Sequence, residues 1–160
     1  MSKRTNVKKE EEDTIVIRDG LTKKILKKGN GSKPKPGQLC YVHYVGKLQE
    51  NGEVFDSSRS RNRPFSFQLH KGQVIMAWDL GVSTMSKGEK AVLTCSPDYA
   101  YGSRGAGGVI PRNATLIFEV DLLEFRDDDR TPISWLVTLL ICAIPILMVC
   151  LKFGIISFDL

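Results

Sequence analysis

The stretch Gln73-Val74-Ile75-Met76-Ala77-Trp78-Asp79-Leu80-Gly81-Val82 decides how the rest of the chain is arranged. Val74 and Ile75 lie four and three residues before Trp78, and Val82 lies four residues after it, which is the spacing of one apolar helix face. The other ordered stretches up to residue 128 have the pattern of strands. The sequence therefore predicts a single short helix that the sheet wraps, because each needs the apolar face of the other.

Two roles for Trp78 are open on these residues alone. A large aromatic side chain where a helix meets a sheet is most often a core anchor. The same position also suits the floor of a binding site. The residues considered below favour a side chain that serves both purposes.

Strands are predicted on both sides of this helix from period-two alternation. Residues 39–48 alternate so that two sets of side chains face opposite sides of a sheet. The sets are Cys40, Val42 and Tyr44, and Tyr41, His43 and Val45. Further strands are predicted over residues 14–17, 24–26, 54–57, 65–69, 91–95 and 115–125. The face of the last strand that should meet the helix carries Leu116, Phe118, Val120 and Leu122.

Three connections have informative compositions. Glu50-Asn51-Gly52-Glu53 predicts a tight hairpin, because Asn-Gly tolerates the positive φ angles of a type I′ turn. Ser58 to Arg63 is a polar excursion rich in arginine. Residues 96–114 form a long irregular connection with four glycines after Tyr101. Loops of that length inside a compact domain are usually functional.

Charge is concentrated at the beginning of the chain. Residues 1–36 hold 11 Lys and Arg against 5 Asp and Glu, and the remaining 124 residues hold 12 against 13. The isoelectric point near 9.1 therefore belongs to the leading segment. Residues 1–13 are expected to be a flexible charged leader, with a basic signal for the nucleus or a lipid surface as the alternative. Nucleic-acid binding is not expected, since the body lacks a basic face interleaved with stacking aromatics.

The sequence offers little support for covalent or metal chemistry. The four cysteines, Cys40, Cys95, Cys142 and Cys150, show no paired spacing and no neighbouring histidine ligands. Cys40 and Cys95 are expected to be small buried residues in a reducing compartment. We recognise no Ser-His-Asp or Cys-His set and no phosphate-binding loop. No metal and no cofactor is therefore expected.

The stretch Ile133 to Leu151 differs in kind from everything before it. It has 19 consecutive residues without a charge, and as a helix at about 1.5 Å per residue it would span roughly 28 Å, close to the hydrocarbon thickness of a bilayer. Pro145 is unfavourable in a soluble helix but tolerated in a membrane one. The sequence predicts a C-terminal transmembrane helix over residues 133–151, after a linker over 129–132 and before a short tail over 152–160.

The candidate pocket residues are mostly apolar and aromatic. They are Tyr44, Phe55, Phe65, Val74, Ile75, Trp78, Tyr101, Ile110 and Phe118, with Asp56 and Arg61 as polar members. A nearly apolar concave site with a few polar groups suits ligand binding, or catalysis that needs no covalent step.

Residues 37–125 resemble the FKBP family, the macrolide-binding peptidyl-prolyl isomerases, through six runs in the same order and at nearly the same spacing. The runs are Val42-His43-Tyr44-Val45-Gly46, Phe55-Asp56-Ser57-Ser58-Arg59, Pro64-Phe65, Val74-Ile75 with Trp78, Ser96-Pro97-Asp98-Tyr99-Ala100-Tyr101-Gly102, and Ile110-Pro111 through Asn113-Ala114-Thr115-Leu116. The resemblance implies an α+β domain over residues 14–128, a twisted antiparallel β half-barrel wrapped around one short α-helix. It also implies that the candidate residues above line the family's pocket, with Trp78 at its floor. Proline-containing proteins and macrolides are the ligands that it implies.

Three features depart from the familiar pattern of the family. Ala106 stands where many members carry a bulkier ring, and Gln73 stands where many carry Glu. The turn over residues 50–53 is one residue longer than in the smallest members. These changes fall on the rim of the pocket, so they bear on ligand affinity and partner choice.

The implied activity, cis/trans isomerisation of X-Pro bonds, has a physical rationale. Rotation about a peptide C–N bond sacrifices resonance, with a barrier of about 18–20 kcal/mol, and the twisted transition state is less polar than the planar amide. A dry aromatic pocket therefore disfavours the planar state relative to the twisted one. By resemblance, the Ile75 backbone N–H and the Tyr101 hydroxyl hold the carbonyls of the substrate, while Asp56, oriented by Arg61, tunes the polar edge. The residues expected to carry catalysis are Tyr44, Asp56, Trp78, Tyr101 and Phe118.

Two other functions stand as alternatives. Some members of the family use the domain as a docking module whose isomerase activity is secondary. An unrelated small-ligand carrier is the remaining possibility. A prolyl-isomerase assay on residues 1–130, with and without a macrolide, separates the three.

The position of the uncharged stretch predicts a tail-anchored protein with residues 1–132 in the cytosol. The first 13 residues are polar and charged, so no N-terminal signal peptide is expected. The trailing residues hold one Lys and one Asp rather than a basic cluster, which favours the endoplasmic reticulum over the mitochondrial outer membrane. Asn113-Ala114-Thr115 is an N-glycosylation acceptor that should stay unmodified in a cytosolic domain.

Overall fold

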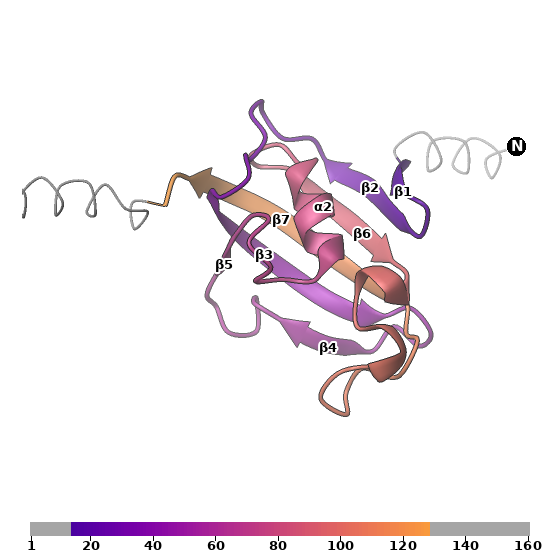
Figure 1. Ribbon diagram of the computed structural model, residues 1–160. Helices are drawn as coiled ribbons and strands as arrows, with labels where there is room; N and C mark the ends of the chain where they lie inside the picture. Colours follow the sequence, from indigo (N-terminus) through magenta and orange to yellow (C-terminus); the bar gives the residue numbers. More distant parts are fainter. Residues whose placement is uncertain (1–13, 129–160) are drawn as a thin grey trace, which may run out of the picture. The chain divides into compact units, whose positions relative to one another are not determined.

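The computed structural model describes residues 14–128, in which seven strands and one α-helix are present (Figure 1). The elements are β1 (Thr14–Arg18), β2 (Leu21–Lys27), β3 (Leu39–Leu48), β4 (Val54–Ser57), β5 (Phe65–Gln68), α2 (Met76–Ser83), β6 (Lys90–Cys95) and β7 (Leu116–Arg126). The predicted leader, linker, transmembrane helix and tail, over residues 1–13, 129–132, 133–151 and 152–160, lie outside the described residues. Within 14–128, no helix is long and apolar enough to cross a membrane.

The strands form one sheet in the order β1-β2-β6-β7-β3-β4, with β5 also paired to β3, and all of these pairings are antiparallel. The two longest strands, β3 and β7, pair along their whole length, from Leu39 opposite Arg126 to Leu48 opposite Leu116. Helix α2 packs on one face of this sheet (Figure 1). The predicted α+β fold, with an antiparallel sheet around one short helix, is confirmed.

The alternation in the long strands determines which face meets the helix. In β3 the buried side chains include Cys40, Val42 and Tyr44, as the period-two pattern predicted. On β7 the whole predicted face is buried: Leu116, Phe118, Val120 and Leu122. The Phe118 ring lies 5.5 Å from the Trp78 ring, centroid to centroid, so this face does meet α2.

The helix is shorter than the sequence pattern predicted, because it begins at Met76 rather than at Gln73. Val74 and Ile75 precede it, and Ile75 is its N-cap with extended backbone. The Gln73 amide instead hydrogen-bonds back to Gln68, accepting from its backbone N–H at 3.0 Å. Two of the four apolar positions that suggested the helix therefore lie in the chain that leads into it.

The turn between β3 and β4 is wider than predicted, and the type I′ assignment was wrong. A type I′ turn needs positive φ at both central residues, but of Asn51 and Gly52 only Gly52, at φ 73°, has it. The Gly52 N–H donates to the Leu48 carbonyl at 2.9 Å, which closes a turn of five residues. The register of the hairpin shifts next to it, between Gly46 and Lys47.

The long connection between β6 and β7 is better ordered than its composition suggests. It holds two short 3₁₀ helices, Pro97–Tyr99 and Gly102–Arg104. A small antiparallel bridge then joins Ala106 and Ile110 through two backbone hydrogen bonds of 2.9 and 3.0 Å. The same connection carries Tyr101, between the two 3₁₀ helices.

One charged pair is buried between the sheet and the segment after the helix. Lys23 on β2 and Glu89 are only 2% and 5% exposed, and Lys23 Nζ lies 2.8 Å from Glu89 Oε1. Lys23 also donates to the Thr84 carbonyl at 3.1 Å, and Glu89 Oε2 accepts from the Ser86 N–H at 2.9 Å. This network ties β2 to the C-terminal end of α2.

Candidate active site

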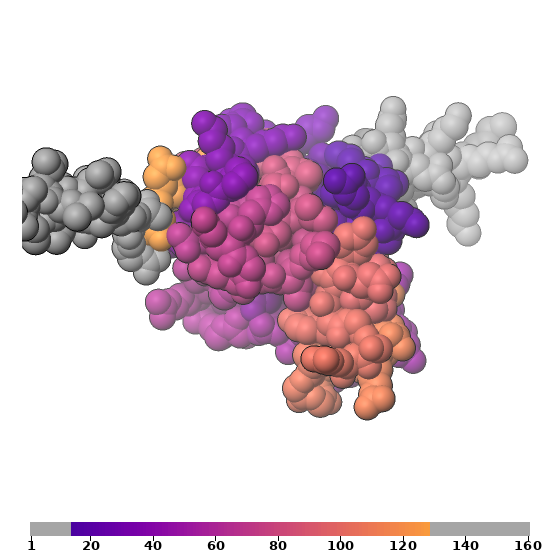
Figure 2. Space-filling model, viewed as in Figure 1, coloured from indigo at the N-terminus to yellow at the C-terminus, as the bar shows by residue number. Residues whose placement is uncertain are grey.

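A cavity of about 240 Å³ opens between the helix, the sheet and the loop that carries Tyr101. Its lining comes from β3, β4, β5, the chain before α2, α2 itself, the β6–β7 connection and β7: Tyr44, Phe55, Asp56, Phe65, Gln73, Val74, Ile75, Trp78, Tyr101 and Phe118. Figure 2 shows the segment around α2 and the β6–β7 connection side by side on the viewed face. Nine of the eleven predicted pocket residues are therefore brought together in one cavity.

Trp78 is the hub of the aromatic walls. Its ring centroid lies 4.8 Å from that of Tyr44, 5.8 Å from that of Phe65 and 5.5 Å from that of Phe118, all in edge-on geometry. Phe55 in turn meets Phe118 edge-on at 5.7 Å. Edge-on contacts suit the quadrupoles of the rings, and Tyr44, Trp78 and Phe118 are almost fully buried. The floor of the cavity is thus built from buried aromatic rings that pack against one another.

Trp78 belongs both to the hydrophobic core and to the cavity, which are the two roles that the sequence left open for it. Its Nε1 is buried and has no hydrogen-bond partner among residues 14–128. An unpaired buried N–H is costly in a protein interior, so this indole is held in place by packing rather than by a polar contact.

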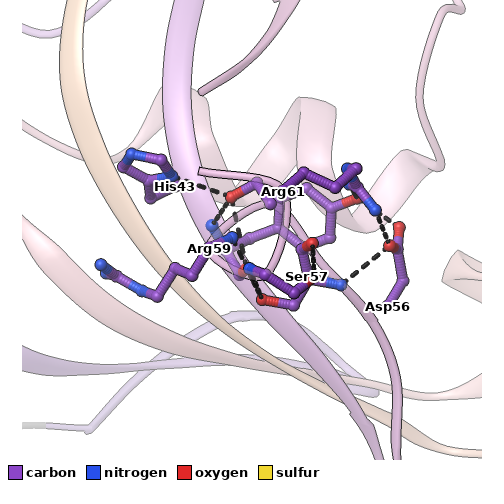
Figure 3. A network of polar contacts seen from close by, with 8 residues as sticks. His43, Asp56, Ser57, Arg59 and Arg61 are labelled. Atoms are coloured by element: carbon purple, nitrogen blue, oxygen red, sulfur yellow. Dashed lines mark hydrogen bonds and ion pairs between the residues drawn. The ribbon is translucent and has the colours of Figure 1, made fainter. Parts of the chain in front are cut away.

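The polar edge of the cavity is a three-residue network of Tyr44, Asp56 and Arg61 (Figure 3). The Tyr44 hydroxyl donates to Asp56 Oδ2, and Arg61 Nη1 donates to Asp56 Oδ1 at 2.5 Å. Arg61 Nη2 donates to the Tyr44 hydroxyl oxygen at 2.9 Å. The sequence-based prediction that Arg61 orients Asp56 toward Tyr44 describes this arrangement.

The network changes the acid–base properties of its members. Burial works to raise the pKa of the Asp56 carboxyl, but the hydrogen bonds from Arg61 and Tyr44 hold that pKa below its ordinary value. Burial, together with the hydrogen bond to Asp56, raises the pKa of the Tyr44 hydroxyl to about 12. Burial also raises the pKa of the Tyr101 hydroxyl, with a contribution from the Asp56 charge. At neutral pH the edge therefore presents one carboxylate and two neutral phenols.

Two predicted pocket residues lie just outside the lining. Arg61 is half-exposed and acts on the cavity through Asp56 and Tyr44. Ile110 is buried at 8% exposure and is bonded to Ala106, so it closes the loop behind Tyr101. Gln73, which the sequence marked only as a rim departure, lines the cavity directly.

Ser58 is a positioning residue that the sequence reasoning missed. It is buried, and its Oγ accepts from the Tyr44 N–H at 2.9 Å and lies 3.0 Å from His43 Nδ1. Ser57 supports the same turn, because its Oγ accepts from the Arg59 N–H at 3.1 Å. A pair of short hydroxyl residues directly after the Asp56 strand was the available signal.

The cavity has the means for non-covalent catalysis and little else. No Ser, Cys or His side chain is among the residues that line it. The described cysteines, Cys40 and Cys95, are buried, and burial raises the pKa of each thiol to about 12, which suppresses the thiolate. Within residues 14–128, no group of three His, Cys, Asp or Glu side chains is placed to hold a metal ion.

Comparison with known proteins agrees with this geometry. Residues 30–123 match the family described as FKBP-type peptidyl-prolyl cis-trans isomerase. FK506-binding protein 1 of Dictyostelium discoideum is 55% identical over 107 residues, which cover 67% of this chain and 99% of the relative. Peptidyl-prolyl cis-trans isomerase Fkbp12 of Drosophila melanogaster is 59% identical over 97 residues, 60% of this chain and 89% of the relative. FK506-binding protein 59 of the same fly is 50% identical over 114 residues, but these cover only 26% of that longer protein.

The match spans more than half of the chain, includes every residue that lines the cavity, and contains β3 to β6, α2 and most of β7. An aromatic cavity without a Ser, Cys or His side chain in its lining is compatible with isomerisation of a peptide bond, since that reaction forms no covalent intermediate. The chain belongs to the FKBP-type peptidyl-prolyl cis-trans isomerases.

Proposed function

We propose that the cavity around Trp78 is the catalytic site, and that it accelerates rotation about X-Pro bonds without covalent chemistry. The observation that carries this proposal is the pairing of a buried aromatic floor with one ionised carboxylate at the edge. The planar amide has a larger dipole than the twisted transition state. Transfer from water into an apolar cavity therefore costs the ground state more than the transition state.

Two hydrogen-bond donors at the mouth are placed to hold the substrate's carbonyls. The backbone N–H of Ile75 makes no hydrogen bond within residues 14–128, although the residue lines the cavity. Tyr101, which is 39% exposed, lines the same cavity and offers its hydroxyl. Held by these donors, the segment carries its proline ring onto the indole of Trp78, and Tyr44 and Phe118 enclose it.

The test is an isomerase assay on residues 1–130 with an X-Pro peptide that has an apolar residue before the proline. We expect catalysis at micromolar protein, and inhibition by a macrolide ligand of the family, whose binding would occupy the same cavity. An uncatalysed rate from folded protein that still binds the macrolide would favour the docking-module alternative. Failure to bind the macrolide would point to the rim changes at Gln73 and Ala106.

We also propose that the protein presents this domain at a membrane, tail-anchored through Ile133 to Leu151, with the domain on the cytosolic side. The support is the run of 19 uncharged residues, which matches the thickness of a bilayer. The endoplasmic reticulum is our preferred membrane because the residues after the run lack a basic cluster.

The charge at one end of the domain agrees with that placement. Backbone bonds from Asn30 to Lys87 (3.0 Å) and from Gly37 to Leu69 (2.8 Å) bring three loops together at the end of the sheet where β7 finishes. These loops and the end of β2 expose six lysines that have no acidic partner among residues 14–128: Lys27, Lys28, Lys33, Lys35, Lys71 and Lys87. Lysines near an anionic leaflet each contribute about 1 kcal/mol of attraction.

Sealed microsomes test the topology. We expect the full chain to resist carbonate extraction, Asn113 to carry no glycan, and added protease to digest the domain. Asn113 is exposed on its loop, so a glycosylating enzyme could reach it if the domain were in the lumen. A glycan on Asn113 or protection of residues 1–130 would overturn the cytosolic placement, and extraction by carbonate would overturn the anchor.

A further inference from the structure

The arginine-rich connection between β4 and β5 forms a second concavity next to the catalytic cavity. This groove has a volume of about 410 Å³ and is lined by Arg61, Arg63, Pro64, Phe65 and Ser66. Phe65 also lines the catalytic cavity, where its ring lies 5.8 Å from that of Trp78. One aromatic side chain is therefore a common wall, and a peptide bound across Trp78 would reach the groove with the residues that flank its proline.

The three arginines of the connection differ in their partners. Arg59 forms an ion pair with Asp121, and Arg61 pairs with Asp56. The Arg63 guanidinium has no carboxylate or other polar partner within residues 14–128, and its residue is exposed. The groove thus contains one arginine whose charge is already compensated and one whose charge is free.

The backbone holds this free arginine in a defined place. Ser58 anchors one end of the connection, buried beneath Tyr44. Asn62 adopts positive φ (49°), and its N–H donates to the Arg59 carbonyl at 3.0 Å. The Arg63 N–H then reaches the Ser58 carbonyl at 3.4 Å, and Pro64 restricts the backbone that follows. A connection ordered in this way loses little further entropy when a ligand binds.

We propose that Arg63 is a specificity-determining residue that binds an anionic side chain flanking the proline of the substrate. The guanidinium presents a planar fork of donors that fits a carboxylate or a phosphate, and the Phe65 wall places it beside the catalytic cavity. The enzyme therefore prefers X-Pro segments with an acidic or phosphorylated residue on the side of the chain that lies along the groove. This proposal rests on the cavity around Trp78 being the catalytic site.

The test is a scan of X-Pro peptides in which a single Glu is moved over the four positions on either side of the X-Pro pair. Each Glu peptide is compared with its Gln twin on the full chain in detergent, and a phosphoserine arm separates carboxylate from phosphate recognition. We expect kcat/KM to rise about two- to fivefold for Glu over Gln at one or two adjacent positions on one side. An exposed ion pair is worth up to about this ratio. The gain should appear in KM and shrink at high salt.

Three variants decide whether Arg63 is responsible. Arg63→Gln should remove the difference between the Glu and Gln twins, and Arg63→Glu should reverse it in favour of a Lys peptide. Arg112→Gln is the matched control, because Arg112 is exposed on another loop and outside the groove. The control should keep the wild-type ratio. The proposal would be overturned by equal rates on the Glu and Gln twins in the wild type, or by a preference for Glu that survives in Arg63→Gln. In either case, catalysis of the Gln peptides would still support the cavity around Trp78 as the catalytic site.

Discussion

At the scale of single residues, the mouth of the cavity depends on the placement of one carboxylate. Asp56 is 41% exposed, yet it receives hydrogen bonds from both Tyr44 and Arg61. Asp56 is therefore held by Arg61 on the β4–β5 connection and by Tyr44 on the floor of the cavity. Tyr44 in turn touches Trp78 edge-on, so the polar edge and the apolar floor share a residue.

Asp56→Ala should lower kcat/KM about tenfold and leave the fold intact. The carboxylate acts on the site through its charge and through the hydrogen bonds that hold Tyr44 and Arg61, whereas its packing contribution is small at this exposure. The isomerase assay measures the loss, and circular dichroism with urea unfolding checks the fold. Wild-type activity from the variant would mean that the edge charge has no catalytic role.

Asp56 should also make stability depend on pH at the acid end. Its folded-state pKa lies below its ordinary value of 3.8, so the carboxylate form is favoured by folding. The contribution is present above about pH 3.8 and is lost as the pH falls through the lower folded-state pKa. We expect a contribution of less than about 1 kcal/mol, because the group is exposed to solvent. Urea unfolding of wild type and Asp56→Asn should show a stability difference at pH 6 that narrows below pH 3.8.

At the scale of elements, helix α2 and the sheet hold each other in place. The helix has only eight residues, too few to be stable alone in water. It buries Ala77, Trp78, Gly81 and Val82 against the sheet. Gly81 marks the closest approach, since a Cβ there would lie 2.5 Å from Leu93 Cδ1 on β6. Tertiary packing rather than local propensity therefore stabilises this helix.

Trp78→Ala should destabilise the protein by about 3–5 kcal/mol and also abolish catalysis. The cost follows from removing a buried aromatic side chain that four other rings contact. Chemical denaturation measures the stability, and Trp78→Phe serves as the comparison. The Phe variant should lose less stability, because the indole N–H makes no hydrogen bond among the described residues that the substitution would remove. Equal stability of Trp78→Ala and wild type would contradict the role of α2 as the plug of the sheet.

The buried pair of Lys23 and Glu89 should show strong coupling. Glu89→Gln alone leaves the Lys23 charge buried without compensation, which costs about 3–5 kcal/mol. Adding Lys23→Met removes that charge, while the amide oxygen introduced by Glu89→Gln can still accept from the Ser86 N–H. We expect the double variant to recover more than half of the lost stability, measured as the free energy of unfolding in urea. Additive effects of the two changes would show that the pair is not coupled.

At the scale of the whole molecule, the described residues 14–128 contain a hydrophobic core of their own. The hydrophobic cluster runs from Leu21 to Leu122, within the described residues. The Dictyostelium relative is covered over 99% of its length by a match of 107 residues. The corresponding region of this chain should therefore fold by itself, independently of what the residues after Asp128 do.

A fragment of residues 14–128 should unfold in urea at the same midpoint as the full chain in detergent and retain its isomerase activity. The reason is that the core, the cavity lining and the groove at Arg63 all lie inside it. A lowered midpoint would indicate that residues 1–13 or 129–160 contribute to the stability of the domain.

Most of the fold and most of the cavity lining could be predicted from the amino-acid sequence. Alternation in residues 39–48 and 115–125 identified the buried faces correctly, because a period of two depends only on the strand geometry. The resemblance to the family predicted nine of the residues that line the cavity. The spacing of apolar residues in 73–82 predicted the helix that carries Trp78. These features are local, so they can be recognised from neighbouring residues alone.

Features that depend on residues far apart in the chain could not be predicted and became visible only in the folded domain. Lys23 is buried because Glu89, 66 positions away, compensates its charge, and no local pattern contains that information. Gln73, which hydrogen-bonds to Gln68, lines the cavity, although the sequence predicted it only at the rim. Ile110, which bonds to Ala106, lies outside the lining, although the sequence predicted it inside. The free charge of Arg63 likewise follows from which carboxylates Arg59 and Arg61 meet. Periodicity identifies a face of an element, but the partner that meets this face is chosen by packing in three dimensions.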